Sequence, residues 1–258
     1  MEQTSRKKKK KQPAQQSTVQ VSLTVNNVKP LTDNQSDFFR SFERFNVLSL
    51  HGCPGTGKTF IAVYKALKAL ESPNSPYKSI KIIRSNVSVR DVGFLPGSAA
   101  DKMAVYEAPY MTIVNDLFGR GDAYGILKQK KIIEFFPTSY MRGVTFNDCI
   151  VIIDECQNMS YGELNTIITR FGNNCKMVMC GDTKQDDLTS ERYKEQSGYG
   201  EIQSILQRVA TCKMIEFSTE DIVRSGFVKE YILAQINAAE PKKPVFLREI
   251  TDNLLLLE

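Results

Sequence analysis

One short stretch constrains the fold of this chain more than any other feature. It consists of His51, Gly52, Cys53, Pro54, Gly55, Thr56, Gly57, Lys58 and Thr59. The apolar run 45–50 precedes it, and an apolar segment with helical spacing starts at Phe60. The glycines let the backbone bend tightly and turn successive N–H groups inward, and a following helix adds the positive end of its dipole. The stretch therefore predicts a strand, a phosphate-binding loop and a helix.

The spacing Gly-x4-Gly-Lys-Thr between a strand and a helix indicates a site for a nucleoside triphosphate. We expect residues Gly52 to Thr59 to surround the phosphates. Lys58 would reach the β- and γ-phosphates, and the Thr59 hydroxyl would bind Mg²⁺. The alternative is a glycine-rich turn before a helix that happens to begin with Lys-Thr.

The rest of the chain alternates strand-like and helix-like segments. Short apolar runs predict strands at 79–83, 131–136, 149–153, 176–180 and 212–217. Helical spacing predicts helices at 58–71 and 99–118, and Pro109 would kink or split the second of these. A shorter helix with Phe38 and Phe42 on one face should be capped near Thr32 or Asp33. This alternation predicts an α/β fold, with a mostly parallel sheet covered by helices on both faces.

The net charge of +5 is concentrated at the N-terminus. Within residues 1–20, Arg6 and Lys7 to Lys11 face only Glu2, so the rest of the chain has no net charge. Few apolar side chains are present there, so we expect disorder, with a possible edge strand at 19–28. The lysines are either a tether for phosphate backbones or a solvated tail. We expect a basic tail at 1–28, one folded domain at 29–240 and a second tail at 241–258.

Composition excludes several classes of protein. No apolar stretch approaches the roughly 18 residues of a membrane span, and no apolar segment follows the basic run, so we expect a cytoplasmic protein without membrane contact. The cysteines form no Cys-x2-Cys pair and His51 is the only histidine, so structural zinc is not expected. The cysteines should be reduced and mostly buried.

Two predicted strands end in acidic residues. Asp154 and Glu155 follow one strand, and Asp182 ends another. The carboxyl ends of parallel strands form the ligand-binding edge of such sheets. We expect Asp154 to hold the Mg²⁺ that Thr59 also touches, and Glu155 to orient or deprotonate a water beside the γ-phosphate. Adjacent acids with separate roles favour hydrolysis over transfer to a small alcohol; the alternative for the pair is a helix N-cap.

Six motifs together resemble PhoH-like ATPases. They are, in order, Gly-Cys-Pro-Gly-Thr-Gly-Lys-Thr, Gly-Phe-Leu-Pro-Gly, Met-Arg-Gly, Ile-Ile-Asp-Glu-Cys-Gln-Asn, Gly-Asp-Thr-Lys-Gln and Glu-Asp-Ile-Val-Arg-Ser. The resemblance covers about residues 29–237, and the chain looks like the short forms carried by bacteriophages. It implies a RecA-like P-loop NTPase core, similar to the first motor domain of superfamily 1 helicases. It also implies ATP and Mg²⁺ as cofactors and ATP hydrolysis as the activity.

The resemblance implies roles for three further residues. Gln35 would bind the adenine edge, since an amide can donate and accept at once; a surface glutamine is the alternative. Gln185 would sense the γ-phosphate, unless it is an ordinary loop residue. Arg224 would meet the γ-phosphate, where a guanidinium can add about 10³- to 10⁵-fold in rate. A helix-surface pair of Arg224 with Glu220 is the alternative.

The predicted catalytic residues are thus Lys58, Glu155, Gln185 and Arg224. Arg84 and Arg142 are weaker candidates for phosphate or nucleic-acid contacts, and surface salt bridges explain them equally well.

A complete helicase of this superfamily has two motor domains, and this chain has room for one. We therefore expect a homo-oligomer, as a ring, whose neighbouring subunit completes the site. The leading hypothesis is an ATPase acting on RNA or single-stranded DNA, in the host cytoplasm if a phage encodes it. The alternatives are an ATP-dependent switch that binds a protein partner and, less favoured, a small-molecule kinase.

Overall fold

The computed structural model describes residues 24–85, 99–141, 143, 145–182 and 197–239, and these contain one six-stranded sheet. The strands are β1 (Val47–Gly52), β2 (Ser79–Arg84), β3 (Ile133–Pro137), β4 (Cys149–Asp154), β5 (Lys176–Asp182) and β6 (Cys212–Phe217). They lie in the order β3-β2-β4-β5-β1-β6, and every neighbouring pair is parallel. The predicted strands and the predicted parallel sheet are confirmed.

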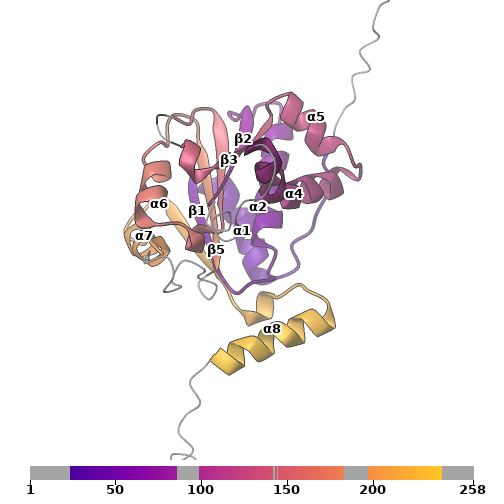
Figure 1. The fold of residues 1–258 in the computed structure, drawn as a ribbon, viewed down its shortest axis with the longest axis vertical. Helices are drawn as coiled ribbons and strands as arrows, with labels where there is room; N and C mark the ends of the chain where they lie inside the picture. The colour runs from indigo at the N-terminus through magenta and orange to yellow at the C-terminus, as the bar shows by residue number, and fades with distance from the viewer. Residues whose placement is uncertain (1–23, 86–98, 142, 144, 183–196, 240–258) are drawn as a thin grey trace, which may run out of the picture.

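Helices cover both faces of this sheet (Figure 1). They are α1 (Asp33–Arg44), α2 (Lys58–Glu71), α4 (Ala99–Phe118), α5 (Ala123–Gln129), α6 (Tyr161–Ile168), α7 (Tyr199–Leu206) and α8 (Gly226–Ala239). The same described residues also form the single-turn 3₁₀ helices η1 (Thr138–Tyr140), η2 (Cys156–Asn158) and η3 (Thr219–Asp221). In Figure 1, α6 and α7 lie on one side of the strands and α2, α4 and α5 on the other.

Strand β4 shows how the sheet divides the core into two apolar clusters. Ile150 and Ile152 belong to the cluster that includes side chains of α2 and α4, whereas Val151 and Ile153 belong to the cluster with α6 and α7. Successive side chains of a strand point to opposite faces, so a strand covered on both sides must be apolar throughout. This explains why β4 is a continuous apolar run up to Asp154, all of it buried.

The order of the strands determines where the site forms. Strand β5 lies between β1, which leads into the phosphate loop, and β4, which ends in Asp154. All carboxyl ends lie at the same edge because every pairing is parallel. This arrangement is the RecA-like P-loop core that the motif resemblance implied.

The predicted helices are also confirmed, with one correction. Thr32 caps α1 by accepting a hydrogen bond from the Gln35 N–H, and α2 covers the predicted residues. Pro109 does not split the helix at 99–118, because α4 runs unbroken through it. A proline removes one backbone N–H, and the surrounding turns of this long helix continue past that single loss.

The possible edge strand at 19–28 is wrong for its described part. Residues 24–28 pair with no strand of the sheet. Instead, the Val25 N–H donates to the Glu71 carboxylate at 2.5 Å, and the Asn26 N–H donates to the Leu117 carbonyl at 2.8 Å. The C-terminal ends of α2 and α4 thus accept hydrogen bonds from backbone N–H groups that the apolar–polar alternation of the sequence had assigned to a sheet. Residues 19–23, like the rest of the two predicted tails up to 23 and from 240, lie outside the described residues.

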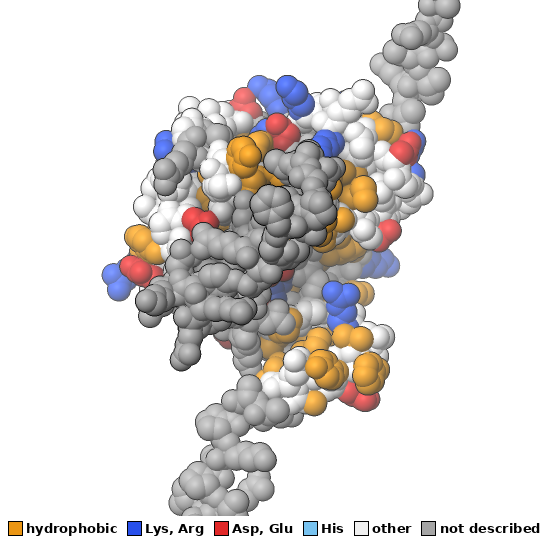
Figure 2. Space-filling model, viewed as in Figure 1, with side chains coloured by type: hydrophobic (Ala, Val, Ile, Leu, Met, Phe, Trp, Pro, Cys, Tyr) orange, Lys and Arg blue, Asp and Glu red, His pale blue; other side chains and the backbone are white. Residues whose placement is uncertain are grey.

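Helix α8 stands apart from the body of the molecule (Figure 1) and exposes apolar side chains (Figure 2). Phe227 is 78% exposed and Tyr231 is 56% exposed. In the part of the chain that the structure describes, no helix has the length and apolar character needed to cross a membrane.

Gly52 should tolerate no side chain. Its φ is +119°, and a Cβ there would lie 2.0 Å from the Phe217 carbonyl oxygen. We expect Gly52→Ala to lower the free energy of unfolding by at least about 2 kcal/mol, through backbone strain and overpacking. Denaturant unfolding measures this loss. The control is Gly162→Ala in α6, where a Cβ meets no atom within 4 Å and should be neutral or stabilising. Equal stability of both variants would contradict the argument.

Candidate nucleotide-binding site

The loop between β1 and α2 has the backbone of a phosphate-binding nest. Gly55 and Gly57 adopt positive φ angles of +74° and +80°. These two glycines alternate with residues of ordinary conformation, and this alternation turns the backbone N–H groups to one side. Neighbouring segments fix the loop from outside. The Cys53 N–H donates to the Phe217 carbonyl at 2.8 Å, and the Val223 N–H donates to the Gly55 carbonyl at 3.1 Å. The loop is therefore pre-formed by contacts from β6 and the segment after it.

The Lys58 side chain lies over this loop. Its Nζ donates to the Cys53 carbonyl at 2.6 Å and to the Thr56 hydroxyl at 3.3 Å. Burial lowers the pKa of Lys58, and the nearby Asp182 carboxylate is the largest influence in the other direction. The ammonium group thus sits in a partly desolvated position, where it can exchange loop carbonyls for phosphate oxygens.

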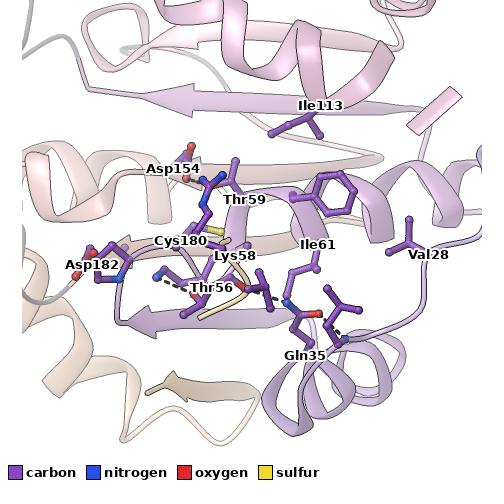
Figure 3. A pocket seen from close by; sticks show the side chains of 18 of the residues that line it. Val28, Gln35, Thr56, Lys58, Thr59, Ile61, Ile113, Asp154, Cys180 and Asp182 are labelled. Carbon is purple, nitrogen blue, oxygen red and sulfur yellow. Dashed lines mark hydrogen bonds between the residues drawn. The ribbon is translucent and has the colours of Figure 1, made fainter. Parts of the chain in front are cut away.

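Thr59 and Asp154 meet, although they come from different elements. The Thr59 hydroxyl donates to Asp154 Oδ1 at 2.8 Å, and the Tyr110 hydroxyl donates to Asp154 Oδ2 at 2.7 Å. Figure 3 shows Thr59 and Asp154 next to each other at the same end of the cavity. A carboxylate and a hydroxyl are hard oxygen ligands of the kind Mg²⁺ prefers, so these residues fit the predicted metal.

Glu155 follows Asp154 in an unusual backbone conformation. Its φ is +54°, uncommon for a residue other than glycine, and such strain is typical of functional sites. Burial raises the pKa of its carboxyl, the Asp154 charge raises it further, and the Arg84 guanidinium opposes the shift. Arg84 lies 3.7 Å from Glu155 Oε1. A carboxylate at this position, beside the acid predicted to bind the metal, has the chemistry to take a proton from a water.

Gln157 connects the two acidic strand ends, and no sequence argument singled it out. Its Nε2 donates to Glu155 Oε2 at 2.7 Å, and its Oε1 accepts from the Asp182 N–H at 2.9 Å. The side chain is buried. Its amide therefore fixes the Glu155 carboxylate relative to the end of β5. The available signal was an amide two residues after the acid pair, within the motif that carried the resemblance.

A cavity of about 500 Å³ lies at this edge of the sheet, and the predicted residues Gly52 and Cys53 are not among those that line it. The following residues of its lining were predicted for the site: Gln35, Pro54, Gly55, Thr56, Gly57, Lys58, Thr59, Asp154, Glu155 and Arg224. The apolar part of the lining includes Val28, Ile61 and Ile113; Figure 3 shows Val28 and Ile61 toward Gln35, and Ile113 on the far side of the cavity from it. The cavity thus has a polar end at the strand ends and an apolar end suited to a flat ring.

Gln35 lies at this apolar end, but its amide already binds the backbone. Nε2 donates to the Thr56 carbonyl at 2.9 Å, and Oε1 accepts from the Leu31 N–H at 2.8 Å (Figure 3). Gln35 is buried, which disfavours the surface-glutamine alternative. Its contact with an adenine remains a prediction, since the amide still has a second N–H and a second lone pair.

Arg224 lies at the opening of the cavity, close to the phosphate loop. A Cβ on Gly55 would meet the Arg224 Cγ at 3.1 Å. Among the described residues Arg224 forms no ion pair, so the alternative pair with Glu220 does not form. The segment is held by Asp221, which accepts hydrogen bonds from Asn34 and from the Ser218 N–H, both at 2.8 Å. Gln185 and Arg142 lie outside the described residues.

The sequence is similar to proteins of one known family. The family model described as PhoH-like protein matches residues 27–235. The PhoH-like protein of Bacillus subtilis (strain 168) is 34% identical over 204 residues, which are 79% of this chain and 62% of that protein. Protein PhoH of Escherichia coli (strain K12) is 30% identical over 202 residues, covering 78% of this chain and 56% of that protein. The chain spans less than two thirds of the length of these relatives.

The solved structures are more distant. The large terminase from a thermophilic bacteriophage aligns with 79% of this chain and 50% of that chain, at 12% identity and a TM-score of 0.47. A likeness of this degree supports no argument about the present site.

Gln157→Met should destabilise the fold, because it leaves the buried Asp182 N–H and one Glu155 oxygen without their shared partner. We expect a loss of about 1–3 kcal/mol in the free energy of unfolding. Denaturant titration of both proteins measures it. Gln207→Met, at the exposed C-terminal end of α7, is the matched control and should stay within about 0.5 kcal/mol of the parent. A Gln157→Met protein as stable as this control would contradict the bridging role.

Proposed function

The chain belongs to the PhoH family, and on that premise we propose that it binds ATP with Mg²⁺ and hydrolyses it. The observation that carries the proposal is the contact of Thr59 with Asp154 at 2.8 Å, beside Glu155 and at the mouth of a pre-formed phosphate loop. Family membership and the P-loop together support a nucleotide-binding protein of the ATPase type.

In the proposed mechanism the loop N–H groups and Lys58 bind the phosphates, while Thr59 and Asp154 hold Mg²⁺. The metal neutralises charge on the phosphate oxygens when it is bound. Glu155 would orient the attacking water and accept its proton, as the water oxygen bonds to the γ-phosphorus and the bond from that phosphorus to ADP breaks. Arg224, which lines the cavity, would contact the outer phosphate, and Gln185 would respond to the loss of that phosphate.

We further propose that hydrolysis drives conformational work on RNA or single-stranded DNA, in the cytoplasm, by a ring of identical subunits. Arg224 is exposed and lines the cavity, so a neighbouring subunit could contact the site there. A switch that binds a protein partner is the second candidate. The exposed apolar face of α8 favours it specifically, because such faces mark interaction surfaces.

Replacement of Glu155 tests the chemical step. Glu155→Gln should bind a fluorescent ATP analogue as the parent does but release phosphate at least about 100-fold more slowly, because the amide cannot accept the proton. A second variant, Lys58→Ala, should lose nucleotide binding or turnover, because it removes the ammonium group that lies over the phosphate loop. Glu201→Gln, an exposed acid in the first turn of α7, should keep the parent rate. Hydrolysis by Glu155→Gln at the parent rate would remove Glu155 from the mechanism.

The proposed target and assembly are tested with the parent protein. Phosphate release should rise severalfold with RNA or single-stranded DNA but not with duplex, and the stimulation should fall steeply with salt, because phosphate contacts release counterions. Sedimentation with and without ATP should show an oligomer. Stimulation by a protein partner alone would favour the switch. A strictly monomeric enzyme whose specific activity is independent of concentration would exclude the ring.

A further inference from the structure

Helix α4 contributes one side chain to the predicted metal site. Among the described side chains of α4, only that of Tyr110 is hydrogen-bonded to Asp154, the carboxylate predicted to bind Mg²⁺. Its hydroxyl donates to Asp154 Oδ2 at 2.7 Å, while the other oxygen, Oδ1, accepts from Thr59 at 2.8 Å. The Asp154 carboxylate is therefore held at both oxygens, by one group from the phosphate-loop helix and one from α4. Such a two-point hold leaves little freedom to rotate about the Asp154 side-chain bonds.

The Tyr110 ring is itself held rigidly. It is fully buried, and its centroid lies 5.6 Å from that of Phe135 on β3. It belongs to the apolar cluster that fills the space between α4 and the sheet. A phenol whose ring is fixed by close packing can place its hydroxyl with little variation. The position of Asp154 Oδ2 is thus set by the core and not by solvent.

The neighbouring cation lies beside the other acid of the pair. The Arg84 guanidinium lies 3.7 Å from Glu155 Oε1, and its charge interacts with Tyr110 and Asp154. The two adjacent carboxylates therefore have different neighbours: Asp154 accepts from Tyr110 and Thr59, and Glu155 lies beside Arg84.

We propose that Tyr110 is a positioning residue for the metal site: it holds the Asp154 carboxylate so that Oδ1 faces Thr59 and a bound Mg²⁺. The inference rests on the proposed function, since it needs Mg²⁺ to bind between Thr59 and Asp154. Groups that orient ligating side chains typically change metal affinity by about 10- to 100-fold when removed. Tyr110 acts through Asp154 and has no contact of its own with the nucleotide in this assignment.

The chain offers a closely matched control in Tyr124. Tyr124 is also buried, is also a tyrosine of the same apolar cluster, and donates its hydroxyl to a carboxylate, Glu107 Oε1, at 2.5 Å. Glu107 and Tyr124 are not part of the cavity lining. Tyr110→Phe and Tyr124→Phe therefore each remove one oxygen and one hydrogen bond to a carboxylate, and only the first of these carboxylates belongs to the proposed metal site.

The experiment titrates free Mg²⁺ against binding of a fluorescent ATP analogue to the full chain. Tyr110→Phe should need about 10-fold more Mg²⁺ for half-maximal enhancement of nucleotide binding, with unchanged affinity for the nucleotide in the absence of Mg²⁺. Tyr124→Phe should keep the parent Mg²⁺ dependence even where it lowers the melting temperature. The rise in melting temperature that Mg²⁺ adds to that caused by nucleotide alone gives a second reading on folded protein, and Tyr110→Phe should lose most of it.

A Mg²⁺ dependence of Tyr110→Phe equal to that of Tyr124→Phe overturns the inference and leaves the proposed function intact. The Asp154→Ala protein distinguishes failure of the inference about Tyr110 from failure of the proposed metal site. If the parent shows a Mg²⁺ effect that Asp154→Ala lacks, the metal site is established and the tyrosine result decides the inference. If the parent and Asp154→Ala show the same dependence on Mg²⁺, Asp154 holds no metal, and both the inference and the proposed metal site are wrong.

Discussion

Parallel pairing of β1, β5 and β4 is the constraint on which the whole site depends. Because the register sets Gly52 opposite Asp182 and Arg84 opposite Asp154, the ends of four strands lie side by side. The Thr59–Asp154 bond then joins residues 95 positions apart in the sequence. Neither end of that bond could be placed without the sheet, since Asp154 ends β4 and Thr59 lies in the first turn of α2, after the loop that follows β1. The positions of the polar groups in the cavity therefore depend on the hydrogen bonds between these strands.

Much of this arrangement follows from local sequence signals. The apolar run of β4 and the Gly-Lys-Thr ending of the loop are short patterns whose physical causes act within a few residues, and the structure has them where they were expected. Asp154 could be placed near Thr59 because parallel strands share an edge. The family resemblance is confirmed as well, because the family model described as PhoH-like protein matches residues 27–235.

The parts that the sequence did not predict depend on packing between distant elements. Tyr110 lies in the middle of a predicted helix, where an aromatic residue indicates only a buried face. Its hydroxyl has a role at the site only because α4 packs where it can reach Asp154 at the end of β4. Gln157 likewise gains its role from the approach of the β5 end. Residues 24–28 end the segment 19–28, whose alternation predicted a possible edge strand, yet two helix ends bind their backbone. In each case the deciding partner is remote in sequence, so no local pattern could indicate it.

The attachment of α8 to the phosphate loop has a mechanical consequence. The Gly55 carbonyl binds the Val223 N–H, and a Cβ at Gly55 would come within 3.1 Å of Ile232 on α8. The same loop residue therefore touches the chain on both sides of the start of that helix. A backbone shift at Gly55 would therefore disturb the hydrogen bond from Val223 and the approach of Ile232 together. The position of α8 is in this way linked to the conformation of the phosphate loop.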